Sequence, residues 1–76
     1  MINRIGEILK EKKAGNNDLV KHLKVKKETV SRWVNNKQQP TLTTLNQIAE
    51  YLRVDIRDLL QPSDWSNSKV EAFEKK

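Results

Sequence analysis

The segment from Asn16 to Asn35, NNDLVKHLKVKKETVSRWVN, most restricts how this chain can fold. Five of its apolar residues fall into two sets at helical spacing: Leu19 and Leu23, then Val30, Trp33 and Val34. Residues three or four apart share one face of a helix. The pattern therefore predicts two short helices, from about 16 to 24 and from 26 or 27 to 35, which pack through their apolar faces.

The outer face of the second helix is expected to be polar. Its residues are Lys26, Lys27, Glu28, Thr29, Ser31 and Arg32. Each of these side chains can donate or accept a hydrogen bond, and an α-helix fits the major groove of duplex DNA. The segment therefore predicts a helix-turn-helix that binds DNA. Trp33 is expected in the core, the alternative being a platform on which a base stacks.

The positive charge is concentrated around these two helices. The net charge is +5, but between Lys10 and Pro40 nine Lys or Arg residues face three Asp or Glu, which gives +6 there and −1 for the remainder. Such an excess is typical of a phosphate-binding surface. The alternative is a solvated lysine face that only maintains solubility.

Length and composition exclude several other classes of protein. Seventy-six residues are expected to form one domain with a limited core. The chain has no cysteine, and His22 is its one histidine, without clustered carboxylates nearby. Neither a metal site, a cofactor nor an enzymatic function is therefore expected. No apolar run approaches the roughly 20 residues of a membrane span and no signal peptide is evident, so a cytoplasmic protein is expected.

Three further helices are expected around this pair. Residues 2–13 have Ile2, Ile5, Ile8 and Leu9 on one face, with Asn3 as a cap, a pair between Glu7 and Lys10, and Gly15 as the helix breaker. Gly15 or Asn16 is expected to cap the helix that follows. A helix after Thr41, Thr43 or Thr44 presents Leu42, Leu45, Ile48, Ala49 and Leu52. Asp55 caps a short helix over 56–60, ended by Pro62. The apolar residues of this last segment are expected to pack on the first and fourth helices and complete the core: Val54, Ile56, Leu59 and Leu60. The prediction is a compact all-α fold of five helices, with Asn36 in the left-handed conformation after the third.

The composition changes near residue 61. We expect a domain over 1–61 and a tail over 62–76, either disordered or forming one more helical turn. Trp65 and Phe73 suggest that the tail makes a contact, either with this chain's own core or with a partner subunit. The apolar residues expected to contact a second copy are Ile56, Leu59, Leu60 and Trp65.

The segment LVKHLKVKKETVSRWVNNKQQPTLTTLNQIAEYLRVDIRDLL, residues 19–60, resembles the phage-repressor and Cro-like, or XRE-like, helix-turn-helix family. The resemblance extends back to Asn3 through NRIGEILKEK. It implies a compact five-helix, lambda-repressor-like domain that regulates transcription and binds double-stranded operator DNA as a two-fold homodimer. Short members include phage repressors, restriction-modification controllers and antitoxins, among which the sequence does not decide.

The resemblance also implies a set of contact residues. Lys27, Glu28 and Arg32 match the outward positions that contact bases; Arg or Lys recognises guanine O6 and N7, and Glu accepts from cytosine N4. The alternative is an ion pair between Glu28 and Arg32 on a solvated face. Contacts to the DNA backbone are implied for Asn16, Asn17, Lys26, Thr29, Ser31, Asn35, Lys37, Gln38 and Thr41. The alternatives are plain capping for the two asparagines and an ordinary turn for the loop.

Three residues depart from the family pattern. Val20 replaces a small residue at the helix crossing, Lys24 replaces glycine in the turn, and Lys26 replaces a serine or threonine cap. A left-handed lysine costs on the order of 1 kcal/mol relative to glycine. A second hypothesis is a protein-interaction module, such as an antitoxin that binds its partner protein through the tail from Gln61.

Overall fold

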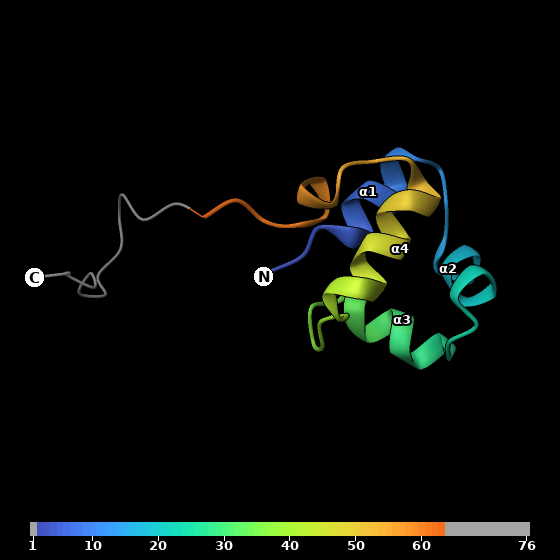
Figure 1. Cartoon of the computed structure of the whole chain (residues 1–76). Coiled ribbons are helices and arrows are strands. Elements are labelled where there is room, and N and C mark those ends of the chain that lie inside the picture. Colours follow the sequence, from blue (N-terminus) through green and yellow to red (C-terminus); the bar gives the residue numbers. More distant parts are fainter. Residues whose placement is uncertain (1, 64–76) are drawn as a thin grey trace, which may run out of the picture.

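The computed structural model describes residues 2–63, and there the chain forms four α-helices and one turn of 3₁₀-helix (Figure 1). The elements are α1 (Ile5–Glu11), α2 (Asn16–Leu23), α3 (Lys27–Val34), α4 (Leu42–Leu52) and η1 (Ile56–Leu59). The all-α prediction is confirmed for this part of the chain, where the only extended pairing is an isolated bridge between Asn3 and Leu60. The expected fifth α-helix is the short η1. The alternatives for the tail, and the contacts expected of Trp65 and Phe73, concern residues outside 2–63.

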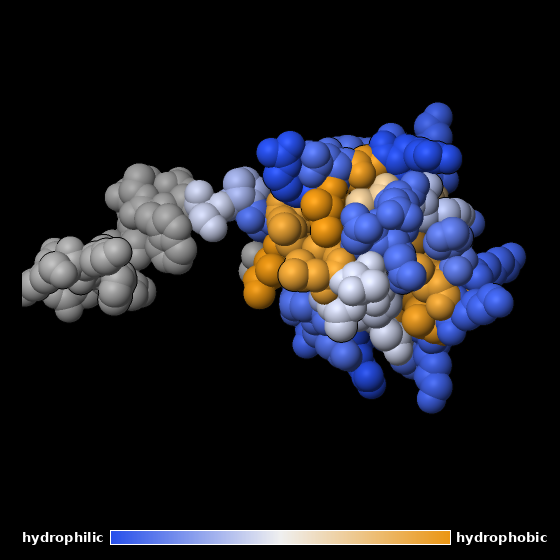
Figure 2. Space-filling model, in the orientation of Figure 1, coloured by the Kyte–Doolittle hydropathy of each residue, from blue (hydrophilic) through white to orange (hydrophobic). Residues whose placement is uncertain are grey.

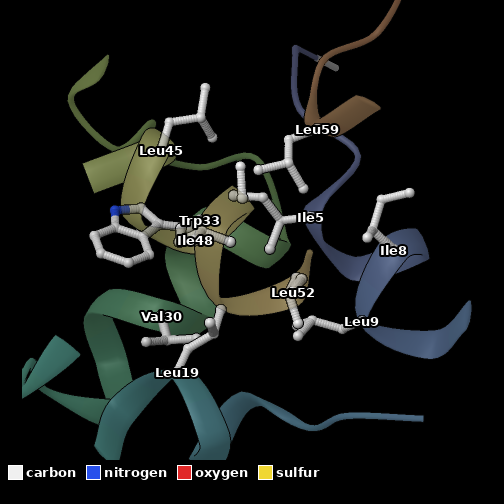
Figure 3. Packing of buried hydrophobic residues seen from close by; sticks show 11 residues of the cluster. Ile5, Ile8, Leu9, Leu19, Val30, Trp33, Leu45, Ile48, Leu52 and Leu59 are labelled. Atoms are coloured by element: carbon white, nitrogen blue, oxygen red, sulfur yellow. The ribbon is translucent and has the colours of Figure 1, made fainter. Parts of the chain in front are cut away.

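All five elements contribute to one hydrophobic core (Figure 3). Its buried residues are Ile5, Ile8, Leu9, Leu19, Val30, Trp33, Leu45, Ile48, Ala49, Leu52 and Leu59. Trp33 is only 5% exposed, so its predicted place in the core is confirmed. Among residues 2–63, no helix has the length and apolar character needed to cross a bilayer.

Two apolar residues are exposed although the sequence pattern placed them on apolar helix faces. Ile2 is 60% exposed, because α1 begins only at Ile5 and the residues before it are not helical. Leu42 is 76% exposed at the first position of α4, whereas Leu45, one turn later, is buried. Leu59 was expected both to complete the core and to contact a second copy. It is fully buried in this chain's own core, so the first expectation is confirmed and the second is wrong.

Each α-helix is followed, within two residues, by a non-glycine residue in the left-handed conformation. These residues are Lys13, Lys24, Asn36 and Arg53, with φ of 55°, 55°, 57° and 58°. The predictions for Lys24 and Asn36 are confirmed. Lys13, and not Gly15, makes the turn after α1. Gly15, with φ −121°, is the N-cap of α2, which confirms one of the two expected caps of that helix.

Side chains cap the starts of α4 and η1. Thr41 Oγ1 accepts a hydrogen bond from the Thr44 N–H at 3.1 Å, which selects Thr41 among the three expected caps. The Asp55 carboxylate accepts from the Arg57 N–H at 2.8 Å, as predicted. Hydrogen bonds from the Arg57 side chain and backbone lower the pKa of Asp55. These bonds therefore stabilise η1 above the ordinary pKa of aspartate, and the stabilisation is lost as pH falls through the lowered value.

The N-cap of α1 is Arg4, although Asn3 Oδ1 does accept a hydrogen bond from the Ile5 N–H at 3.1 Å. The Arg4 guanidinium pairs with Glu7 at 2.9 Å. This pair replaces the expected one between Glu7 and Lys10, because Arg4 lies one turn before Glu7 on the same side of the helix.

Asn36 differs from the other three left-handed residues in what its side chain binds. Its Oδ1 accepts from the N–H groups of Ile2 at 3.0 Å and Asn3 at 2.8 Å, and its Nδ2 donates to the Asn3 carbonyl at 3.2 Å. The Asn36 side chain therefore joins the residues after α3 to the first residues of the chain. The side chains of Lys24 and Arg53 are instead exposed to solvent.

This difference predicts opposite responses to glycine. Lys24→Gly and Arg53→Gly should each raise the free energy of unfolding by about 0.5–1 kcal/mol, because glycine adopts positive φ without steric cost. Asn36→Gly should lower it by about 1–2 kcal/mol, because the backbone groups of residues 2 and 3 lose their partners. Urea unfolding of the three variants measures this. If Asn36→Gly is as stable as the other two, the side-chain bonds of Asn36 contribute nothing.

Candidate nucleic-acid interface

The two faces of α3 have different roles. Val30 is fully buried and lies beside Leu19 of α2 in Figure 3, while Lys27, Glu28 and Arg32 on the outer side are exposed. The packing of α2 against one side of α3 thus leaves a row of charged side chains on the other. This is the arrangement that the helix-turn-helix pattern predicted.

A shallow hollow of about 400 Å³ brings the charged residues together. It is lined by Lys27, Glu28, Ser31, Arg32, Asn35 and Lys37. All three residues expected to contact bases therefore share one surface with three of those expected to contact the DNA backbone. The ion pairs within residues 2–63 are Arg4 with Glu7 and Arg57 with Asp55, so the alternative pair between Glu28 and Arg32 is not formed there.

The N-terminus of α2 is a second place suited to a phosphate. The first N–H groups of a helix have no partner within the helix, and the helix dipole favours an anion there. Gly15 holds the N-cap position and donates to the Asp18 carboxylate at 2.8 Å. The capping alternative for Asn16 is therefore wrong. Asn17 is exposed and Asn16 half-buried, but the charge of Asp18 works against an anion at this helix end.

Lys10 lies at this second place, although the sequence did not single it out. It lines a hollow of about 370 Å³ together with Asn16 and Val34, where α1, α2 and α3 meet. In the sequence, Lys10 had contributed only to the count of positive charge and to an expected pair with Glu7. Helical spacing within α1 cannot reveal that it lies near the start of α2, because that proximity depends on how the helices cross.

The remaining expected backbone contacts differ in how accessible they are. Lys26 and Gln38 are exposed and Thr29 is half-buried. The Thr41 hydroxyl is engaged in capping α4, since it accepts from the Thr44 N–H and donates to Thr44 Oγ1 at 3.0 Å. A phosphate at Thr41 would have to compete with this cap.

A protein-family model matches most of the chain. The model of the Cro/C1-type helix-turn-helix DNA-binding domain matches residues 4–64. The chain belongs to this family. A similar solved structure is the crystal structure of a "putative DNA-binding protein" from Bacteroides fragilis. Its sequence is 42% identical to that of this Cro/C1-type chain, and the two structures match with a TM-score of 0.77. The match covers 80% of this chain and 100% of the other. Comparison with curated proteins finds no match.

The Cro/C1-type domain accommodates its three departures from the family pattern in different ways. Val20 is half-buried and packs against the core. Lys24 adopts the left-handed conformation with φ 55° and ψ 43°. Lys26 has the extended backbone of an N-cap, but its side chain makes no capping hydrogen bond. The start of α3 therefore has a positive charge where a hydroxyl would stabilise the helix.

Lys26→Ser should make this Cro/C1-type domain more stable but weaken its binding to DNA. A serine hydroxyl can accept from the Thr29 N–H, so the free energy of unfolding should rise by about 1 kcal/mol. DNA affinity should fall, because one positive charge near phosphate is lost. For the same reason, the slope of the logarithm of the binding constant against the logarithm of salt concentration should become less negative by roughly 0.9. Thermal unfolding and binding titrations measure the two effects. Lys21→Ser, an exposed site inside α2, removes the same charge without creating a cap and should not stabilise.

Proposed function

We propose that this Cro/C1-type domain is a transcriptional regulator that recognises specific operator sequences through α3. The observation that carries the proposal is the shared surface of Lys27, Glu28 and Arg32 on the exposed side of that helix. Such a helix inserts its outer side chains into the major groove, where each base pair presents a distinct set of donors and acceptors.

Each charged residue has a chemical role in this proposal. Arg32 and Lys27 donate to guanine O6 and N7, and Glu28 accepts from cytosine N4. Lys26 and Lys37, at the two ends of α3, bind phosphates on either side of the groove. Asn16, Asn17 and Gln38 add polar backbone contacts. Phosphate contacts set the position of the domain, and the three base contacts determine which sequence is preferred.

Residues that contact bases and residues that bind phosphate should fail differently when truncated. Arg32→Ala or Lys27→Ala should cost about 1–3 kcal/mol of binding free energy and relax the preference at one or two base pairs. Lys37→Ala should weaken binding to all sequences alike and make the salt slope less negative by roughly one unit. Glu28→Ala should lose discrimination with little loss of affinity, since it also removes repulsion from phosphates. Selection from a random DNA pool, followed by salt titration on the selected site, measures both properties.

The parent protein provides the reference for these variants. With about four to six phosphates neutralised per protomer, the logarithm of its binding constant should fall with the logarithm of salt at a slope of the order of −4 to −5. A salt slope near zero for the parent protein would contradict the proposed DNA binding. Selection of an unchanged motif by the Lys27, Glu28 and Arg32 variants would instead remove α3 as the recognition element and favour the protein-interaction hypothesis.

We further propose that two copies bind a pseudo-palindromic site, with their α3 helices in successive major grooves about 34 Å apart. Since Leu59 is buried, the contact would use the half-buried Ile56 and Leu60 together with Ile2. Ile2 lies close to Leu60, because its carbonyl accepts from the Gln61 N–H at 2.7 Å. Hydrophobic surface on the side of the domain from which residues 60–63 lead away supports this choice (Figure 2).

Ile2→Gln should weaken assembly of the two copies on DNA. Leu42→Gln is a matched control, because Leu42 is also exposed but lies at the start of α4. Sedimentation on a duplex with two half-sites should show two protomers per duplex for the parent and the control, and one for Ile2→Gln at the same concentration. A parent that binds the full site as a single copy would contradict the proposed dimer.

A further inference from the structure

The side-chain amide of Asn3 is a buried polar group that neither the hydrophobic core nor the DNA-contacting surface explains. Asn3 is 2% exposed. Its Nδ2 donates to the Trp33 carbonyl at 2.8 Å and to Gln39 Oε1 at 2.7 Å, and its Oδ1 accepts from the Ile5 N–H. Both donor hydrogens of the amide are used. A buried amide that loses a partner retains the cost of its desolvation, so this arrangement strongly favours one geometry.

The partners of Asn3 lie at the end of α3 and in the loop that follows it. Gln39 is half-buried, and its Nε2 also donates to Asn36 Oδ1 at 3.4 Å. Asn36 in turn holds the backbone of residues 2 and 3. The loop is therefore attached to the first residues of the chain at two points, Asn36 and Gln39. The two residues between these points, Lys37 and Gln38, are exposed.

The first residues of the chain are themselves held on their other side. The Arg4 N–H donates to the Leu59 carbonyl at 2.8 Å, and the Gln61 N–H donates to the Ile2 carbonyl at 2.7 Å. Residues 2–4 thus lie between η1 and the loop and are hydrogen-bonded to both. Within the loop, the Lys37 N–H donates to the Arg32 carbonyl at 2.9 Å, which ties the backbone of Lys37 to that of a residue expected to contact bases.

We propose that Asn3 and Gln39 are positioning residues for DNA binding, which hold Lys37 and Gln38 where the DNA phosphates lie when α3 is in the groove. The inference rests on the proposed function. A loop anchored before binding does not have to be ordered on the DNA, so less of the interaction energy is lost to conformational entropy. Gln39 acts through Lys37, and its removal weakens a phosphate contact that it does not itself make.

Gln39→Ala tests this directly, because it removes one of the two attachments of the loop and leaves the bonds from Asn3 to Trp33 and Ile5 in place. Affinity for the site selected by the parent should fall about 5–10-fold, and the salt slope should become less negative. In a Lys37→Ala background the same change should cost less than about twofold, because the contact that Gln39 positions is already absent. Gln47→Ala, an exposed glutamine of α4, should leave affinity unchanged. All measurements are made at a temperature where thermal unfolding shows each variant folded.

Gln39→Met, which keeps the length of the side chain but removes its amide, replaces the alanine variant if that variant does not fold. Parent-like affinity and salt slope in a folded Gln39 variant would overturn the inference. Losses that are fully additive with Lys37→Ala would also overturn it, because a general structural role would weaken both backgrounds equally. Neither result would affect the proposed function, which fails only if the parent itself shows no salt-dependent, sequence-selective binding.

Discussion

The buried amide of Asn3 joins the start of the chain to the end of α3, and the arrangement of the surrounding segments depends on it. An amide at 2% exposure must have its hydrogen-bonding groups satisfied, and here the partners come from α1, from α3 and from the loop after α3. The hydrophobic core would tolerate small shifts of these segments. The amide does not, because its hydrogen bonds require particular distances and directions.

The positive charge of this domain lies at several positions where another residue would be more favourable for folding. Lys13, Lys24 and Arg53 adopt left-handed conformations that suit glycine, and Lys26 holds an N-cap that suits serine or threonine. Together these choices forgo stabilisation of the helix ends. Three of these residues, Lys13, Lys24 and Lys26, belong to the basic segment between Lys10 and Pro40, where positive charge favours binding to a polyanion.

Much of the fold followed from local patterns. Apolar spacing predicted α2, α3 and the buried side of α4. Turn chemistry predicted the cap at Asp55 and narrowed the cap of α4 to three threonines, among which the structure selects Thr41. The errors lie at the ends of elements. Ile2 and Leu42 fit the helical spacing, yet Ile2 precedes α1, Leu42 is the first residue of α4, and both are exposed. Leu59 was expected both in the core and at a contact with a second copy, and η1 packs it into the core.

The sequence by itself determined that α3 has one apolar and one charged side, and hence which of its residues could contact DNA. Periodicity is a property of neighbours along the chain, so it needs no knowledge of the other helices. Tertiary structure alone decided that Asn3 lies against Trp33 and Gln39, and that Lys10 lies near Asn16. A single polar residue has no periodic pattern, and its partners, 30 and 36 positions along the chain, come within hydrogen-bonding distance only when the helices pack.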